Sequence, residues 1–283
     1  MRFRTRFAPS PTGPLHLGHA YSAILAHDMA RAAGGDFLLR IDDIDQSRAR
    51  PAWEAQIYTD LAWLGLTWDA PPRRQSDHLP AYRAPIDRLG QMGLIYPCRC
   101  SRRDIREAAN APQEGGEPLT GPDGLVYPGT CRHRAMAAMG PGDAIRLDMA
   151  KAMARHDTTR GFDETGPAHL GHHPIPAAAM IATIGDVVLA RPAMGASYHL
   201  SVAVDDAAQA ITHVIRGQDL FAATPIHVLL QGLLGMPTPQ YHHHRLIRDE
   251  QGKRLAKRDD ARAIHSYRAD GAAPQDIRRM VGL

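Results

Sequence analysis

Two histidines, His16 and His19, carry the first sign of chemistry in this chain. They belong to the segment His-Leu-Gly-His, which follows a proline-rich stretch and precedes a run with helical periodicity. The first turn of a helix leaves backbone N–H groups without partners, and such a place binds anions, most often phosphate. Imidazoles beside those N–H groups can hydrogen-bond phosphate oxygens as charge develops on them. His16 and His19 are therefore candidates for phosphate chemistry.

The same tetrapeptide recurs at residues 169–172 and provides an internal control. No strand pattern precedes this second copy, and a His-Pro-Ile-Pro run follows it. We predict a surface loop here, with His169, His172 and His173 facing solvent and not a metal. The surrounding sequence, and not the tetrapeptide itself, makes the first copy informative.

Lysine occurs only three times in the chain, and two of these residues share one loop. Lys253 and Lys257 bracket the segment Lys-Arg-Leu-Ala-Lys, whereas Lys151 lies far away in the sequence. A basic loop of this kind is often only a solvated surface. Because a lysine side chain is a compact positive charge, the loop could instead neutralise phosphate groups.

Three cysteines, Cys98, Cys100 and Cys131, lie within one third of the chain, and the rest of the chain has none. An odd number argues against a disulfide framework. Zinc takes four ligands in a tetrahedron and prefers thiolates. No fourth cysteine exists, so the residues alone leave open either a zinc site or three reduced thiols. His133 is a candidate for a fourth ligand because it lies two residues beyond Cys131.

A β-α-β unit is predicted around the first tetrapeptide. Apolar residues alternate with arginines over residues 3–7, as in a strand, and residues 20–33 have the pattern of a helix. A buried strand follows at residues 36–41, and this spacing is typical of a Rossmann-type parallel sheet. The acidic run that begins at Asp42 comes at the carboxyl end of that strand, where open α/β sheets bind ligands. A solvated acidic turn is the alternative.

Further elements continue this pattern along the chain. We predict helices at 51–64, 80–92 and 225–234, strands at 94–98, 145–149, 186–191 and 211–215, and a loop at 157–176. The Rossmann pattern resumes after Pro176. The consecutive histidines at 242–244 are a weak metal candidate, because neighbouring residues of an extended chain point to opposite faces.

The composition is that of an ordinary globular protein. The chain has 283 residues, of which 44% are hydrophobic and 22% charged, and its net charge is +3. No apolar run approaches the ~18 residues that span a bilayer, and the arginine-rich N-terminus is unlike a signal peptide. We expect a cytoplasmic monomer without a membrane partner. The mild positive charge permits nucleic-acid binding but does not indicate it.

These segments resemble the signatures of class I aminoacyl-tRNA synthetases. His16-Leu-Gly-His19 resembles the "HIGH" signature, and its lead-in Arg-Phe-Ala-Pro-Ser-Pro-Thr-Gly resembles the glutamyl branch. The Lys253–Arg258 segment resembles "KMSKS", with Ala256 in place of the usual serine. The resemblance implies that the HIGH-like and KMSKS-like segments bind ATP and, together with Mg²⁺, stabilise the charge on its phosphates. The residues implied are His16, Gly18, His19 and Lys257.

The same resemblance implies a glutamate site. Its residues are Arg6, Ser10, Asp42, Tyr198 and Arg216. The chemistry is reasonable in itself, because glutamate has two carboxylates and arginine grips a carboxylate with two hydrogen bonds. Asp42 stands where the family carries a glutamate that is implied to hold the α-ammonium, and it is one methylene shorter.

A short branch of the glutamyl family is implied to bind Zn²⁺ through Cys-x-Cys and Tyr-x-x-x-Cys. These patterns match Cys98, Cys100, Tyr127 and Cys131. The tyrosine oxygen is then the fourth ligand, with His133 as its rival. Likeness to this branch implies ATP-dependent activation of L-glutamate and its transfer to queuosine in the anticodon of tRNA(Asp).

Only 25 residues follow Arg258, so we expect no anticodon-binding domain of the kind that ordinary glutamyl-tRNA synthetases are implied to carry. Three rival functions remain. One is a conventional synthetase fragment that charges the tRNA 3′ end. Another is a small nucleotidylyltransferase, which shares His-x-Gly-His but is not expected to carry the lysine loop. The third is a non-enzymatic fragment that binds tRNA or zinc.

The predicted fold class is α/β, a Rossmann-type parallel sheet with an inserted small zinc-binding α+β domain. The two halves of the Rossmann domain are residues 1–97 and 176–258. The insert takes residues 98–175, and residues 259–283 form a short helical tail.

Overall fold

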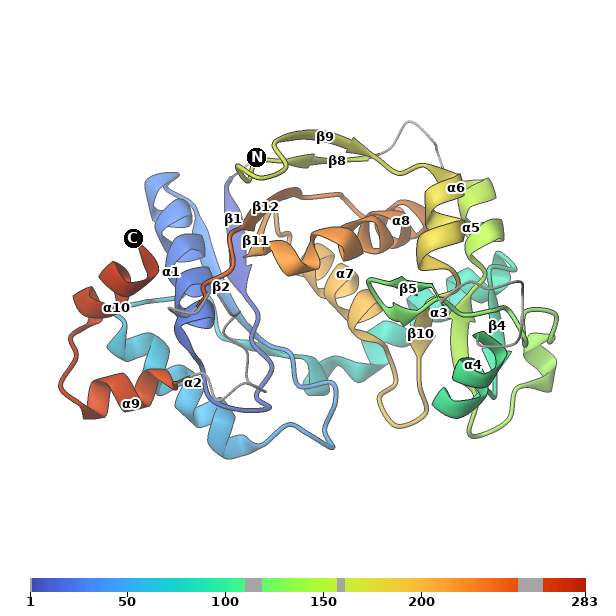
Figure 1. The fold of residues 1–283 in the computed structure, drawn as a ribbon, viewed down its shortest axis with the longest axis horizontal. Helices are drawn as coiled ribbons and strands as arrows, with labels where there is room; N and C mark the ends of the chain where they lie inside the picture. Colours follow the sequence, from blue (N-terminus) through green and yellow to red (C-terminus); the bar gives the residue numbers. More distant parts are fainter. Residues whose placement is uncertain (1, 110–118, 157–160, 249–261) are drawn as a thin grey trace.

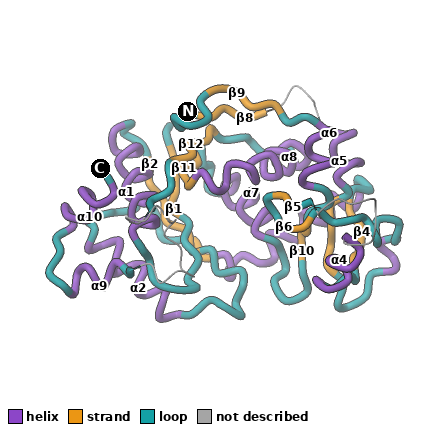
Figure 2. Tube along the Cα trace, in the orientation of Figure 1, coloured by secondary structure: helices purple, strands orange, loops and turns teal. Residues whose placement is uncertain are grey.

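The predicted β-α-β unit forms part of a group of parallel strands at the centre of the molecule. The computed structural model describes residues 2–109, 119–156, 161–248 and 262–283. Lys253, Ala256 and Lys257 lie outside these residues. Figure 1 shows an elongated molecule in which α1, α2, α9 and α10 lie at one end and the strand β4, with α4, at the other. Figure 2 shows one group of strands between these two ends and another at the end that holds β4.

The first strand, helix and strand form as predicted. β1 (Arg4–Phe7) pairs in parallel with β2 (Asp36–Ile41), and α1 (Leu17–Ala32) connects them. β3 (Arg73–Arg74) extends this sheet beyond β2. The helix begins three residues earlier than its apolar pattern indicated, because the side chain of His16 caps its N-terminus. The tetrapeptide is therefore the start of the helix itself.

A second group of parallel strands continues the sheet on the other side of β1. β11 (His213–Gly217), β12 (Gln240–His244) and β8 (Gly161–Glu164) are parallel, and β9 (Gly171–Pro174) is antiparallel at the edge. β1 and β11 lie side by side, since the Thr212 N–H donates to the Arg4 carbonyl oxygen at 2.9 Å. The carboxyl ends of β1, β2, β11 and β12 thus meet at one edge.

Helices cover both parts of this sheet. They are α2 (Pro51–Trp63), α3 (Arg83–Gln91), α7 (Tyr198–Ala208), α8 (Thr224–Leu234), α9 (Ile264–Ala269) and α10 (Pro274–Val281). One apolar cluster packs α1 and α2 on β2 through residues such as Ile24, Leu39 and Leu61. A larger cluster joins α3 and α8 to the insert through Leu89, Leu229 and Leu147. The insert therefore shares a core with the parallel sheet.

A small antiparallel sheet lies at the centre of the insert, a name used for this sheet and the elements around it. Its strands are β4 (Ile95–Cys98), β7 (Ala144–Leu147) and β10 (Val188–Ala190), in the order β10-β7-β4. Around it lie α4 (Arg102–Ala109), the hairpin of β5 (Thr120–Gly121) and β6 (Gly124–Leu125), α5 (Met149–Arg155) and α6 (Ala177–Ala179). Short 3-10 or π turns occupy Gln75–Tyr82, Met136–Ala138, Met180–Ile184 and Gln218–Ala223.

Several sequence-based expectations differ from the structure. Residues 161–174 form the hairpin β8–β9 and not the predicted loop, and the rings of Phe162 and His173 stack across the paired strands. The strand predicted at 186–191 pairs with β7 in the insert and does not resume the parallel sheet. The predicted strand at 145–149 ends at Leu147, since Asp148 caps α5.

The helix predicted at 80–92 is α-helical only from Arg83, after a 3-10 segment that is kinked at His78. The predicted domain boundaries stay a prediction, although β10 groups with β4 and β7. Within the described part of the chain, no helix has both the length and the apolar character needed to cross a membrane.

Candidate active site

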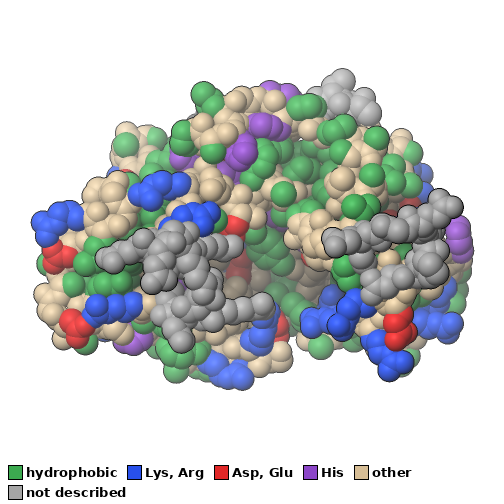
Figure 3. Space-filling model, viewed as in Figure 1, with side chains coloured by type: hydrophobic (Ala, Val, Ile, Leu, Met, Phe, Trp, Pro, Cys, Tyr) green, Lys and Arg blue, Asp and Glu red, His purple; other side chains and the backbone are tan. Residues whose placement is uncertain are grey.

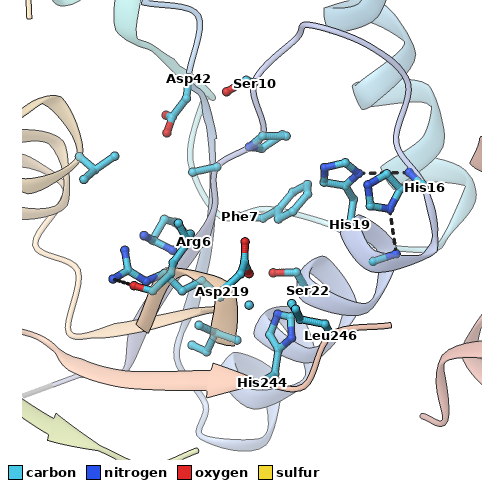
Figure 4. Close-up of a pocket in the computed structure, with 18 of the residues that line it drawn as sticks. Arg6, Phe7, Ser10, His16, His19, Ser22, Asp42, Asp219, His244 and Leu246 are labelled. Carbon is cyan, nitrogen blue, oxygen red and sulfur yellow. Dashed lines mark hydrogen bonds between the residues drawn. The ribbon is translucent and has the colours of Figure 1, made fainter. Parts of the chain in front are cut away.

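A cavity of about 430 Å³ opens at the carboxyl ends of the parallel strands. This is the edge at which open α/β sheets bind ligands. Every glutamate-site residue predicted from the sequence lines it, as do the three described residues of the predicted ATP site: Arg6, Ser10, Asp42, Tyr198, Arg216, His16, Gly18 and His19. Figure 4 shows Asp42 and Ser10 at one end of this cavity and the two histidines at another.

His16 and His19 lie ring to ring at the start of α1. The Gly18 N–H donates to Nδ1 of His16 at 3.1 Å, and the His16 N–H donates to Nδ1 of His19 at 3.2 Å. The ring centroids are 3.8 Å apart. Because both Nδ1 atoms accept, each neutral ring carries its proton on Nε2 and donates through that atom. The pair can thus donate to phosphate oxygens while neutral.

Glycine at position 18 is required by this pair. A Cβ atom there would come within 3.0 Å of Cε1 of His16. A side chain at position 18 would therefore require the His16 ring to shift by a few tenths of an ångström.

Buried ion pairs fix the next part of the site. Arg6 binds Asp206 with two hydrogen bonds of 3.0 and 3.3 Å. Arg40 is fully buried and donates to Asp42 at 2.8 Å and to Asp206 at 2.6 Å. The aspartate that follows β2 is therefore held in place by an arginine from the same strand.

The carboxyl groups of Asp42 and Asp206 differ in the direction in which their pKa is shifted. Burial raises the pKa of Asp42 to about 6, against the opposing effect of the Arg40 guanidinium. Burial also acts on Asp206, but the charges of Arg6 and Arg40 hold the pKa of that carboxyl below its usual range. Asp42 is thus the carboxylate that gains most from a further cation, such as an ammonium group.

Arg216 lies at the end of β11 and is held by neutral acceptors. Its Nε donates to His243 at 3.1 Å, Nη1 to His227 at 3.2 Å, and Nη2 to the Thr224 hydroxyl at 2.7 Å and the Leu220 carbonyl at 3.3 Å. Among the described residues, no ion pair of Arg216 with a carboxylate occurs within 4.0 Å. The side chain is oriented while its charge stays available to an anionic ligand.

The cavity also includes residues that the sequence interpretation missed. Ser22, Asp219, His244 and Arg245 line it, and Figure 4 shows His244 and Asp219 facing the space beside Ser22. Asp219 follows the Arg216-Gly217 pair, and a Cβ at Gly217 would come within 2.4 Å of its carboxylate. Only this close approach in the structure connects Asp219 with the site, and a sequence pattern does not report it.

Lys257 lies outside the described residues, but the chain on both sides of its segment reaches the site. Ile247 lines the cavity. Ala263 forms an isolated antiparallel bridge with His16, and the Ile264 N–H donates to the Leu15 carbonyl at 2.8 Å. The described residues on either side of the segment therefore reach the site: Ile247 at the cavity, and Ala263 beside His16.

The three cysteines gather in the insert, about the hydroxyl of Tyr127. Their sulfur atoms all lie within 4.8 Å of one another. The Tyr127 oxygen is 3.4 Å from the sulfurs of both Cys98 and Cys100, and it accepts from the Cys131 N–H at 2.9 Å. His133, the rival fourth ligand, is exposed. The structure thus brings together the four groups that the resemblance implied.

These donors suit a tetrahedral metal. Ligand atoms about zinc, with bonds of ~2.3 Å, lie ~3.8 Å apart, which is close to the spacing here. Burial would raise the pKa of the Cys131 thiol, but the Tyr127 hydroxyl and neighbouring donors lower it to about 7. The Cys131 thiol therefore ionises more readily than an ordinary cysteine.

Comparison with known proteins supports the assignment. The family model of class I tRNA synthetases (E and Q), catalytic domain, matches residues 2–283. The glutamyl-Q tRNA(Asp) synthetase of Rhodobacter capsulatus is 66% identical over 282 residues, covering 99% of each chain. The glutamyl-Q tRNA(Asp) synthetase of Nocardia farcinica is 41% identical and covers 96% of this chain and 81% of its own.

A solved structure gives the same result for the fold. The glutamate-tRNA synthetase of Elizabethkingia anophelis superposes with a TM-score of 0.80 at 26% identity, over 100% of this chain. The match spans 61% of that longer protein. The histidine pair, the cavity at the strand ends and the full-length match lead to one conclusion: this chain belongs to the family of class I tRNA synthetases (E and Q), catalytic domain.

Proposed function

We propose that this enzyme activates L-glutamate with ATP and transfers the glutamyl group to queuosine in the anticodon of tRNA(Asp). One observation carries the first half. All five predicted glutamate-site residues and the histidine pair line the same cavity. The relatives named above support the second half, since their names specify glutamyl-Q and tRNA(Asp).

Glutamate fits the charges of the cavity. Asp42 takes the α-ammonium, next to Ser10, and Arg6 and Arg216 take the carboxylates. The Asp206 carboxylate already neutralises Arg6, whereas Arg216 meets only neutral acceptors. A substrate carboxylate therefore gains more from Arg216, because no protein anion competes for it.

Activation needs no protein nucleophile. The α-carboxylate of glutamate attacks the α-phosphorus of ATP, the bond to the β-phosphate oxygen breaks, and pyrophosphate leaves. Nε2–H groups of His16 and His19 donate to the phosphate oxygens as charge develops, and Lys257 neutralises them from its loop. Mg²⁺ bound with ATP would add further positive charge. The glutamyl group then passes to a hydroxyl of queuosine, with release of AMP.

Zinc is proposed as a structural metal of the insert, held by Cys98, Cys100, Cys131 and Tyr127. Metal analysis of the purified protein should find one zinc per chain. Tyr127→Phe should weaken zinc retention against a chelator, whereas His133→Ala should leave it unchanged. The reverse result would make His133 the fourth ligand. Loss of zinc should loosen the insert while the parallel sheet stays folded.

RNA binding is supported by the charge of the insert. Arg102, Arg103 and Arg106 on α4 are exposed. Figure 3 shows Lys and Arg side chains gathered on the lower part of the surface at this end of the molecule. We expect affinity for tRNA to fall as salt rises.

The acceptor is tested with two modified RNAs. Glutamylation should survive removal of the 3′-terminal adenosine from tRNA(Asp) and disappear with tRNA(Asp) that lacks queuosine. The opposite pattern would identify a conventional glutamyl-tRNA synthetase that charges the 3′ end.

A further inference from the structure

Arg216 lies at the end of a chain of hydrogen bonds that starts in the insert. Its Nη1 donates to Nδ1 of His227 at 3.2 Å. Nε2 of His227 is 3.1 Å from Nδ1 of His199, and Nε2 of His199 is 3.1 Å from a carboxylate oxygen of Asp123. Two imidazoles thus connect the guanidinium to a carboxylate that lies between β5 and β6.

A second, shorter chain leaves the same guanidinium. Nε of Arg216 donates to Nε2 of His243 at 3.1 Å, and Nδ1 of His243 contacts the Glu164 carboxylate on β8. Glu164 also accepts from the backbone N–H groups of His243 and Gly166, at 2.8 and 2.6 Å. This carboxylate is completely enclosed and firmly placed.

The direction of every bond in these chains is determined. A guanidinium can only donate, so Nδ1 of His227 accepts and the proton of that ring is on Nε2. His227 then donates to His199, whose Nε2–H donates to Asp123. Burial first, and the charge of Arg216 next, hold the pKa of His227 well below its usual value. The same two causes lower the pKa of His243 to about 4. Both rings are neutral, as the chains require.

This arrangement orients Arg216 without neutralising it by direct contact. Four of its N–H donors meet described acceptors, none of which is charged. The guanidinium has five such donors, so one on Nη1 remains for a ligand. The carboxylates at the far ends stabilise the cation through polarised imidazoles. A carboxylate in direct contact would instead compete with the substrate.

We propose that Asp123, His199 and His227 form a relay that positions Arg216 for the glutamate carboxylate, so that the insert contributes a specificity-determining residue to the amino-acid site. The relay rests on the proposed function, in that Arg216 must bind glutamate. His199 lies on α7 and His227 on α8, and both are buried. The β5–β6 hairpin that carries Asp123 lies beside α7 (Figures 1 and 2).

Asp123 offers a clean test, because its side chain is 41% exposed and its removal leaves no buried cavity. Asp123→Ala should raise the KM for glutamate in ATP–pyrophosphate exchange by about threefold to tenfold, the range expected for the net loss of one ordinary hydrogen bond, because Asp123 acts on Arg216 only through two imidazoles. The KM for ATP, the kcat and the melting temperature should stay near wild type. Asp123→Asn keeps an acceptor for His199 and should restore part of the loss.

The hairpin β8–β9 provides a matched control. Asp163 contacts His172 at 2.8 Å in a second Asp–His pair, which is more exposed than the pair of Asp123 and His199 and does not lead to Arg216. Asp163→Ala should leave the KM for glutamate unchanged. Equal KM values for Asp123→Ala and Asp163→Ala would overturn the relay.

A second measurement does not depend on activity. Nitrogen-15 NMR of the histidines should show His199 and His227 as neutral Nε2–H tautomers. An Nδ1–H tautomer at either ring would overturn the relay even if the kinetics agreed. Arg216→Lys tests the proposed function separately. If that change leaves the KM for glutamate as it was, glutamate does not bind at Arg216, and the NMR result still decides whether the chain of hydrogen bonds exists.

Discussion

The segment His-Leu-Gly-His occurs twice in this protein, and the two copies have different surroundings. At residues 16–19 it begins α1, its histidine rings are 3.8 Å apart, and it lines the cavity at the strand ends. At residues 169–172 it covers the end of the turn between β8 and β9 and the first two residues of β9. There His169 stacks on Phe221 at 3.9 Å, and His172 contacts Asp163.

The difference shows what the chemistry requires. Leu17 packs against the apolar cluster under α1, whereas Leu170 is 74% exposed. The first copy combines a helix N-terminus, a fixed pair of rings and a cavity with arginines. The second copy shares only the residue types. Position at the carboxyl edge of a parallel sheet therefore makes the difference, and substitutions in the two copies should separate sharply.

The largest effect should come from His19→Ala. Loss of one donor to the developing phosphate charge should lower kcat/KM for glutamate-dependent exchange by about a hundredfold to a thousandfold. The melting temperature should change little, because the side chain is only partly buried. Near-normal exchange by this variant would remove the first copy from the reaction.

A pH effect should follow from Asp42. Its raised pKa of about 6 means that it becomes protonated as the pH falls through 6 and then no longer pairs with an ammonium group. The KM for glutamate should therefore be flat above pH 7 and rise by about tenfold for each pH unit below 6. Asp42→Asn should have a high KM that is independent of pH over this range. A wild-type KM that stays constant down to pH 5 would exclude Asp42 as the ammonium partner.

Substitution of the glycine in each copy should affect a different property: activity at Gly18 and stability at Gly171. Gly18→Ala places a Cβ 3.0 Å from the His16 ring, so activity should fall by about tenfold through displacement of that ring while stability is kept. Gly171 has φ +125°, so Gly171→Ala should cost about 1–3 kcal/mol of stability and leave kcat unchanged. Paired measurements of exchange rate and thermal unfolding check both. A stability loss at Gly18 without an activity loss would reverse this assignment.

The smallest effect should come from His172→Ala. The ring is exposed and bonds only the exposed Asp163 among its described contacts, so exchange activity should stay within twofold of wild type. A loss comparable to that of His19→Ala would mean that the second copy also takes part in the reaction.

Part of the fold could be predicted from the sequence, because local patterns determine some of its elements. Alternation over residues 3–7 and the glycine stop after residue 33 are local signals, and the β1-α1-β2 unit formed as expected. The β8–β9 hairpin was missed because histidines occupy positions where an apolar pattern was sought. β10 was recognised as a strand, but its pairing with β7 is a long-range contact that no local pattern reports.

The candidate site shows the same division. Arg6, Asp42 and Arg216 were identified through resemblance to a family, and the structure brings them to one cavity. His199 and His227 gave no signal, because a buried histidine within an apolar helix looks like ordinary core. Their role depends on Asp123, which is 76 residues from His199 in the sequence.

ATP–pyrophosphate exchange, measured with each amino acid in turn and without tRNA, tests the central claim most directly. The claim is that the cavity beside the first His-Leu-Gly-His copy activates glutamate. Exchange should require L-glutamate, should be weak or absent with D-glutamate, L-glutamine and L-aspartate, and should be lost in His19→Ala but kept in His172→Ala. Exchange that proceeds without any amino acid, or that is equally fast with L-aspartate, would contradict the claim.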